Sequence, residues 1–516
     1  MLTTLSVNGE RSRTIDKMIR KEDQDLVHAY LEDSSGLRNA FCEAVVFPES
    51  IQEVQDFLKE ASAKKTPVTI SGGRTAVTGS GIPFGGAVLA TDRLNKILEI
   101  GKLDSGGYAV VEPGVRIEEL QEEAARFGLV YLPEPTERNA FIGGTLATNA
   151  SGARGFKYGP TRNYVRRIKV VLGNAEYLEI KRGEIFARKR RLTIKHNPVE
   201  KEIILPSYTM PGIKSSAGYF VKDDMDLIDL FIGQEGTLGC ITEIELSLGL
   251  KGKNSFGIIL FFKEESKALE IIHKIKEISF LTRKGKADSN IDALSLEYFD
   301  RFSLELLRQK FSQIPQELES ALLVEQEYTS ENQNSILEDW VNFLDKKGII
   351  LENSWFSQTD KEKDFFREFR HSLPMLVNEI VKRNGFPKVG TDIAVGDVEF
   401  REMYKFYKST LINSGLNYVI FGHIGENHLH VNILPKNDAE FTRAQEAYME
   451  LVKKAVSLGG TVSAEHGIGK LKHKYLEMMY GKEAVQEMVQ LKKQLDPDLI
   501  LGLDNIFPKE LLRSVS

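Results

Sequence analysis

Five of the chain's nine histidines fall within 51 residues near the C-terminus: His423, His428, His430, His466 and His473. Imidazole is the commonest protein ligand for a divalent metal, because one ring nitrogen keeps a lone pair at neutral pH. Glu465, directly before His466, adds a carboxylate ligand beside a second group that can accept a proton. We interpret the cluster as a metal site. The alternative is a set of hydrogen-bonded core or surface histidines.

The spacing of the first three histidines indicates a β-hairpin. Residues 417–423 are rich in strand formers, residues 425–427 have turn chemistry, and residues 428–434 alternate strictly. A side-chain period of two places His428, His430 and Asn432 on one face and apolar residues on the other. The apolar face can then be buried while the polar face meets a cavity, with His423 ending the first strand beside it.

Two glycine-rich stretches mark the N-terminal half. Residues 67–70 predict a short strand, which leads into SGGRTAVTGSG (71–81), and PEPTERNAFIGGTLATNASGARGFKYG covers 133–159. Consecutive backbone N–H groups in such turns bind anions, and Arg74, Thr75 and Ser80 can add charge and hydroxyl donors. The first stretch is neither a Walker loop nor a Gly-x-Gly-x-x-Gly fingerprint, so an ordinary glycine turn is the alternative. Together the two stretches could grip one extended cofactor.

Length and composition narrow the class of protein. The 516 residues are too many for one core and predict two or three domains, and a net charge of -6 argues against nucleic acid as the principal partner. Cys42 and Cys240 are too few for a disulfide framework, which favours a reducing compartment. Without a secretory pattern or a run of about 18 apolar residues, we expect a cytoplasmic protein with no transmembrane segment.

Seven motifs, in order along the chain, resemble those of one flavoenzyme family. They are SGGRTAVTGSG (71–81), VVEPGV (110–115), IGGTLATNASG (142–152), KYGPTRNYV (157–165), FIGQEGTLGCITE (231–243), GHIGENHLH (422–430) and SAEHGIGK (463–470). The family is the vanillyl-alcohol oxidase superfamily, in the branch that holds D-lactate dehydrogenases, D-2-hydroxyglutarate dehydrogenase and the glycolate oxidase D subunit. The resemblance runs over most of the chain.

The resemblance implies an α+β fold with a flavin at a domain junction. A PCMH-type FAD-binding domain of two α+β lobes is expected over residues 41–250, after an N-terminal helical extension over residues 1–40. A cap domain with an antiparallel sheet flanked by helices, containing the metal-binding hairpin, is expected over residues 251–460. Residues 461–516 should return to the flavin site.

The resemblance also implies the FAD contacts. The glycine stretches should hold the pyrophosphate, and residues 234–239 should lie against the adenine side. The contacts carried over are Gly72, Gly73, Arg74, Thr75, Gly79, Ser80, Thr136, Gly143, Gly144, Thr148, Glu235, Gly236 and Gly239. Some relatives attach the flavin covalently to a histidine in the first loop, but residues 70–86 contain neither His nor Cys, so we expect non-covalent FAD.

By the same resemblance, His423, His430 and Glu465 match metal ligands, with Zn²⁺ as the expected ion. His466 matches the catalytic base, and Asn432 matches a substrate-contacting amide. The implied reaction is oxidation of a D-2-hydroxy acid, resembling D-lactate, to the 2-oxo acid, with hydride transfer to flavin N5. Arg370 is the expected anchor of the substrate carboxylate, with a solvated helix charge as the alternative.

Three departures from the family pattern bear on the substrate. His428 stands in a hairpin where relatives usually read Gly-Asp-Gly-Asn, and it is an added ligand, an outer partner of a ligand or a substrate contact. Pro374 replaces a hydroxyl-bearing residue of hydroxyglutarate-oxidising relatives, and Lys388 is only a candidate for their lysine. The third is LDPDLILGLDNIFP (495–508), which we expect to return to the flavin in altered form.

The sequence also leads to expectations about binding partners and about alternative functions. The partners are the small 2-hydroxy acid, an external electron acceptor (quinone, cytochrome or electron-transferring flavoprotein) and, in a homodimer, a second copy of the chain. The basic run at 187–201 predicts a surface excursion that is solvated, or that docks an acidic partner or an anionic membrane peripherally. The alternative functions are an alkylglycerone-phosphate synthase-like flavin transferase and a non-catalytic flavoprotein subunit of an oxidase complex.

Overall fold

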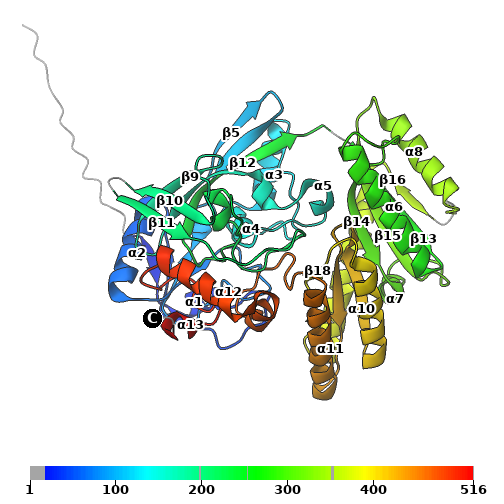
Figure 1. Ribbon diagram of the computed structural model, residues 1–516. Coiled ribbons are helices and arrows are strands. Elements are labelled where there is room, and N and C mark those ends of the chain that lie inside the picture. Colours follow the sequence, from blue (N-terminus) through cyan, green and yellow to red (C-terminus); the bar gives the residue numbers. More distant parts are fainter. Residues whose placement is uncertain (1–17, 197–198, 253, 350–353, 515–516) are drawn as a thin grey trace, which may run out of the picture.

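The computed structural model describes residues 18–196, 199–252, 254–349 and 354–514. Figure 1 shows two bodies, one formed by the chain up to β12 and the other by the segment from β13 to α11. Helices α12 (His473–Leu495) and α13 (Leu511–Ser514) return to the first body. Both bodies combine β-sheets with helices, which gives the α+β fold that the sequence predicts.

A small sheet opens the first body. Its order is β1 (Ile19–Lys21), β2 (Ala44–Phe47), β4 (Ala87–Ala90) and β3 (Val68–Ser71). Only β1 is antiparallel to its neighbour, and α2 (Ile51–Lys64) makes the crossover from β2 to β3. A helical extension is expected over residues 1–40, but the described residues of this segment are not mainly helical. Strand β1 joins this sheet, and α1 (Gln24–His28) has only five residues. Residues 1–17 lie outside the described residues.

An antiparallel sheet forms the second lobe of this body. Its strands are β5 (Ile97–Leu103), β6 (Gly106–Val111), β12 (Cys240–Leu250), β8 (Val165–Val171) and β9 (Tyr177–Lys181), with β7 (Leu129–Val130) paired to β12. The helices of this lobe are α3 (Ile117–Arg126), α4 (Ile142–Thr148) and α5 (Gly155–Tyr158), with short 3-10 turns at Thr161–Tyr164 and Leu227–Phe231. The second glycine stretch therefore becomes α4, α5 and the loops around them.

The basic run forms a separate two-stranded hairpin of β10 (Arg191–His196) and β11 (Val199–Ile204). Leu192 of β10 and Ile203 of β11 have buried side chains. Arg191 is paired with Glu202 across the hairpin at 2.5 Å, and Arg190 Nε contacts Asp223 at 2.6 Å. Two of its positive charges are thus neutralised within the chain. Residues 197–198 lie outside the described residues.

The second body is an antiparallel sheet covered by helices on both faces. Its order is β16 (Trp355–Ser357), β13 (Asn254–Phe262), β15 (Ser320–Tyr328), β14 (Ala293–Phe299), β19 (Tyr418–His423), β20 (His428–Ile433) and β17 (Val389–Gly390), with β18 (Ile393–Ala394) on β20. The helices are α6 (Glu265–Arg283), α7 (Arg301–Leu307), α8 (Gln333–Lys346), α9 (Asp360–Asn384), α10 (Phe400–Ser414) and α11 (Asp438–Ser457).

Strand β13 shows why both faces carry helices. Ile258 and Leu260 pack in the core that includes α6 and α8, whereas Ile259 and Phe261 pack in the core that includes α7 and α9. Successive side chains of a strand point to opposite faces, so a continuous apolar run needs cover on both sides.

The end of the chain is bonded into the first body. Val68 of β3 donates its N–H to Ile500 O at 2.7 Å and accepts the N–H of Gly502 at 2.8 Å. The Asn505 side-chain amide donates to Ser80 O and to Glu235 O, each at 2.8 Å. The segment after α12 is therefore hydrogen-bonded to β3 and to the first glycine loop, and it holds them in place. In the part of the chain that the structure covers, no helix has the length and apolar character needed to cross a membrane.

Candidate active site

A cavity of about 360 Å³ lies between the glycine loops of the first body. Twelve of the residues expected to contact FAD line it: Gly72, Gly73, Arg74, Thr75, Ser80, Thr136, Gly143, Gly144, Thr148, Glu235, Gly236 and Gly239. Gly79 is not among the lining residues. Its φ is +75°, and a Cβ added there would clash with Leu37, which indicates a role in turning the loop instead.

The walls of this cavity fit an extended dinucleotide. A Cβ added to Gly144 would have no neighbouring atom within 4 Å, and one added to Gly72 would meet nothing closer than 3.9 Å, so bare backbone faces the space. The Ser71 hydroxyl is buried without a hydrogen-bond partner among the described residues and also lines the cavity. Glycine backbone and an unsatisfied hydroxyl suit the phosphates and ribose of FAD.

Glu235 lines the cavity, but its carboxylate accepts hydrogen bonds from backbone N–H groups of the protein. Oε1 accepts the N–H of Ile468 at 2.8 Å, and Oε2 accepts the N–H of Gly469 at 2.7 Å. Burial raises the pKa of Glu235 to about 7, although these two N–H groups and nearby lysines act in the opposite direction. Glu235 therefore ties the QEGTLG segment to the segment that carries His466.

The histidine hairpin forms as predicted. Strands β19 and β20 pair antiparallel, and the 3-10 turn Ile424–Glu426 followed by Asn427 at φ +54° closes the loop. The ring centroids of His428 and His430 lie 4.5 Å apart, and the His423 ring lies 5.6 and 5.5 Å from them. The alternation of the sequence has therefore placed three imidazoles together.

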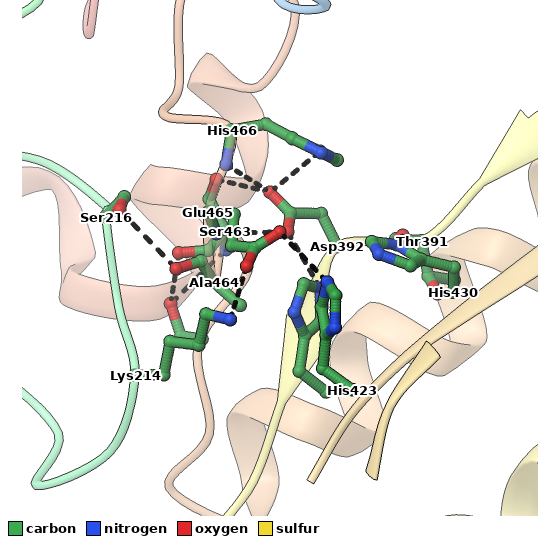
Figure 2. A network of polar contacts seen from close by, with 12 residues as sticks. Lys214, Ser216, Thr391, Asp392, His423, His430, Ser463, Ala464, Glu465 and His466 are labelled. Carbon is green, nitrogen blue, oxygen red and sulfur yellow. Dashed lines mark hydrogen bonds and ion pairs between the residues drawn. The ribbon is translucent and has the colours of Figure 1, made fainter. Parts of the chain in front are cut away.

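Glu465 meets this hairpin from another segment (Figure 2). One ligand atom from each of His423, His428, His430 and Glu465 lies within 4.8 Å of the other three. Glu465 Oε2 is 3.6 Å from His423 Nε2, and Oε1 accepts the Ser151 hydroxyl at 2.9 Å. Three imidazoles and a carboxylate are a donor set suited to Zn²⁺.

Second partners orient two of the imidazoles. His423 Nδ1 is 2.6 Å from Glu297 Oε1, and His430 Nδ1 is 3.4 Å from Thr391 O. Each contact leaves Nε2 of the ring for a metal, which is the arrangement that carboxylate or carbonyl partners give to metal-bound histidines. Burial opposes the ionised form of Glu297, but Arg370 and His423 outweigh it and lower its pKa to about 2.

His466 lies at the meeting point of the cluster and the cavity, which it lines together with Glu465. Its ring is nearly parallel to that of His430, with centroids 5.8 Å apart. Nδ1 is 3.3 Å from Asp392 Oδ2, and a dashed line marks this contact in Figure 2. Burial lowers the pKa of His466 and outweighs the opposite effect of Asp392. A neutral ring whose Nδ1–H faces a carboxylate presents the Nε2 lone pair as a base.

Two family profiles match the chain. The FAD binding domain profile matches residues 42–181, and the profile described as FAD linked oxidases, C-terminal domain, matches residues 278–503. The chain belongs to the FAD-linked oxidases. The first profile covers the loops around the cavity, and the second covers the hairpin and the Glu465–His466 segment.

Relatives of this FAD-linked oxidase include three enzymes of similar length. The glycolate oxidase subunit GlcD of Bacillus subtilis is 28% identical over 95% of this chain and 94% of its own. D-2-hydroxyglutarate dehydrogenase of Stutzerimonas stutzeri is 28% identical over 94% and 95%, and D-lactate dehydrogenase of Anaerostipes hadrus is 28% identical over 89% and 88%. A solved alkyldihydroxyacetonephosphate synthase shares the fold, with a TM-score of 0.65 at 16% identity over 94% of this chain and 82% of that one.

Two further residues expected in the site of this oxidase lie near the cluster. Arg370 on α9 is largely buried, and its Nε is 3.4 Å from Glu297 Oε2, so it is not a solvated helix charge. This contact involves one of the five N–H donors of a guanidinium. Asn432 is buried on β20, and its Nδ2 makes no hydrogen bond among the described residues. Pro374 lies inside α9, and Lys388 is exposed.

The sequence reasoning missed Asp392, which is 2% exposed. It accepts the backbone N–H of Glu465 at 3.1 Å and of His466 at 3.0 Å, and Lys472 Nζ lies 2.7 Å away. Burial would raise the pKa of Asp392, but His466, Lys472 and His428 hold it well below its usual value. The available signal was a single charge inside the apolar stretch 389–395.

Lys214 was also missed. Its buried ammonium forms an ion pair with Glu465 and lies 2.7 Å from Glu426 Oε2. Burial would lower its pKa, but the two carboxylates outweigh burial and raise it. Nothing in the local sequence around Lys214 marks it, because both partners lie more than 200 residues further along the chain.

Proposed function

We propose that this chain oxidises a D-2-hydroxy acid, resembling D-lactate, to the corresponding 2-oxo acid. The observation that supports this most is the position of His466, between the flavin-loop cavity and a cluster of metal-ligating side chains. The names of the relatives, which include D-lactate and D-2-hydroxyglutarate dehydrogenases, point to the same substrate class. The residues of the cavity and of the cluster fit non-covalent FAD and a divalent metal such as Zn²⁺.

The bound groups would supply two kinds of chemistry. FAD in the cavity would accept the α-hydrogen as hydride at N5, and a metal held by His423, His430 and Glu465 would bind the substrate and lower the pKa of its hydroxyl. The chain supplies the proton acceptor. His466 Nε2 takes the hydroxyl proton while Asp392 holds Nδ1–H and fixes the orientation of the ring.

The substrate is oriented by two further side chains. Arg370 offers its remaining N–H donors to the carboxylate, and Asn432 offers an amide N–H that has no partner among the described residues. Pro374 has no hydroxyl to offer a second carboxylate. Lys388 is exposed to solvent, although partial burial lowers its pKa. The proline therefore favours a short 2-hydroxy acid over 2-hydroxyglutarate.

The reduced flavin must pass its electrons to an external acceptor, which we take to be a quinone, a cytochrome or an electron-transferring flavoprotein. The two free thiols, of which Cys240 is buried, support a reducing compartment such as the cytoplasm. The homodimer remains a prediction that sedimentation or light scattering can check.

The test is anaerobic reduction of the flavin. Protein loaded with FAD and Zn²⁺ is mixed with a panel of D- and L-2-hydroxy acids, with and without a chelator, and bleaching of the visible flavin band is followed. We expect chelator-sensitive bleaching by one D-acid, slowed by about 10² to 10⁴ in His466→Ala. His273→Ala, on the exposed side of α6, is the matched control and should match the parent rate.

Two results would contradict the proposal. If His466→Ala is reduced as fast as the parent, His466 is not the base. If no acid bleaches protein that holds both FAD and metal, a flavin transferase without net oxidation or a non-catalytic subunit becomes the better explanation. The fold shared with alkyldihydroxyacetonephosphate synthase is compatible with the first of these alternatives.

A further inference from the structure

His428 is a buried histidine whose polar ring atoms are not satisfied by hydrogen bonds within the described residues. Its side chain is 0% exposed, and neither ring nitrogen makes a hydrogen bond with the described residues. Buried polar groups are almost always satisfied, so an unsatisfied one calls for a partner that binds there. The lone pair of a neutral imidazole nitrogen makes a metal ion a suitable partner.

The surroundings of His428 are those of a ligand. Its ring lies closest to His430, 4.5 Å between centroids, and one of its nitrogens belongs to the four-residue set whose ligand atoms lie within 4.8 Å of one another. His428 Nε2 lies 3.0 Å from Asp392 Oδ1. A carboxylate beside one ring nitrogen is the usual outer partner of a metal-bound imidazole.

The contacts of His428 agree less well with a role as outer partner of a ligand, or as substrate contact, than with a role as metal ligand. An outer partner would hydrogen-bond to a ligand, but no such bond from His428 is found in the described part of the chain. A substrate contact alone would not require a ring nitrogen of His428 to converge with ligand atoms of His423, His430 and Glu465. The convergence of four ligand atoms is the observation that remains.

We propose that His428 is a fourth protein ligand of the metal, which makes the site three imidazoles and one carboxylate. This inference rests on the proposed function only in assuming that the site holds a metal. Three nitrogen donors favour Zn²⁺ or a similar transition metal over Mg²⁺ or Ca²⁺, which prefer oxygen ligands. Four protein ligands also complete a tetrahedral Zn²⁺ shell, so a substrate can bind the ion only by adding to or replacing them.

The experiment counts imidazoles around Zn²⁺. The holoflavoprotein is stripped with a chelator and reloaded with one equivalent of Zn²⁺. X-ray absorption at the zinc edge then gives the number of coordinated imidazoles, and competition with a chromophoric chelator gives the Zn²⁺ affinity. His428→Asn, which replaces the imidazole with a smaller polar side chain, is compared with the parent and with His273→Asn as a matched exposed control.

We expect three imidazoles in the parent and in His273→Asn, and two in His428→Asn. The affinity of His428→Asn should fall by more than about 100-fold, which exceeds the usual cost of losing an outer partner. The parent count needs no variant, so the inference is testable even if His428→Asn does not fold.

The outcomes separate the two proposals. A parent that binds one Zn²⁺ through two imidazoles overturns the role of His428 and leaves the proposed oxidation intact. A parent that binds no Zn²⁺, yet is still reduced by a D-2-hydroxy acid, overturns both the fourth ligand and the metal part of the proposed function. A parent with three imidazoles that no hydroxy acid reduces supports the ligand set and contradicts the reaction.

Discussion

Replacing Glu235 by glutamine is expected to remove a pH dependence of folding stability. Glu235 is 3% exposed, and burial raises its pKa from an ordinary value of 4.5 to about 7. At 1.36 kcal/mol per pH unit, this difference corresponds to about 3 kcal/mol of unfolding free energy. A glutamine side chain would not titrate, and its amide would face one of the N–H groups that Glu235 now accepts, at Ile468 or Gly469.

The sign follows from proton binding. Between pH 4.5 and 7 the folded protein holds a proton on Glu235 that the unfolded chain has lost, so this group's contribution to stability falls as the pH rises. The contribution is fully present below pH 4.5 and is lost by about pH 7. The stability of the parent relative to Glu235→Gln should therefore be greatest at acid pH and should decrease by about 3 kcal/mol toward pH 8.

The assay is urea unfolding of both proteins at pH 5, 6, 7 and 8, followed by far-UV circular dichroism. FAD-depleted protein is used, because flavin release would add its own pH dependence. Titrating groups that do not interact with Glu235 are common to both proteins and cancel in the difference. Lys470 does not cancel fully, because burial lowers its pKa to about 8 while Glu235 acts to raise it. A difference that stays constant within about 1 kcal/mol would show that Glu235 is ionised throughout, with the N–H groups of Ile468 and Gly469 outweighing burial.

Two further predictions concern binding. Gly144→Val should weaken FAD affinity, because the valine side chain would project into the cavity. The control is Gly212→Val, which also has open space around it but lies outside the cavity wall and should bind FAD like the parent. Flavin fluorescence titration measures both affinities, and equal values would mean that FAD does not lie against Gly144. Arg370→Lys keeps the charge but loses the fork of donors, so KM for the hydroxy acid should rise by about 10- to 100-fold with little change in the Zn²⁺ affinity. The control is Arg367→Lys, on the exposed side of the same helix, and an unchanged KM in Arg370→Lys would remove it from the substrate site.

Local patterns predicted the features that depend on neighbouring residues. The alternation at 428–434 gave the strand, the shared face and the imidazole cluster, because strand geometry follows from consecutive residues. The short strand before the first glycine stretch was predicted in the same way and is β3. Motif resemblance added residues far apart in the sequence, and twelve of those named for FAD line one cavity.

Features that depend on distant contacts were not predictable. Asp392 acquires its importance from segments more than 70 residues later, and Lys214 from carboxylates more than 200 residues later. The motif placed Glu235 near FAD, but could not show that its carboxylate is used by backbone N–H groups of a distant segment. The edge strand β1 replaced part of an expected helical extension, because its pairing with β2 is a tertiary contact.

One carboxylate joins the two halves of the site. Glu465 Oε1 is held by Ser151, Gly152 and Lys214, all from the first body, while Oε2 faces His423 of the second. Ser151 and Gly152 also line the cavity between the glycine loops, so a metal bound to Glu465 would be fixed in position relative to that cavity. Any movement that separates the two bodies must therefore disturb the histidine cluster and the cavity wall together. If the cluster binds a metal, its affinity and the flavin environment should change in parallel rather than independently.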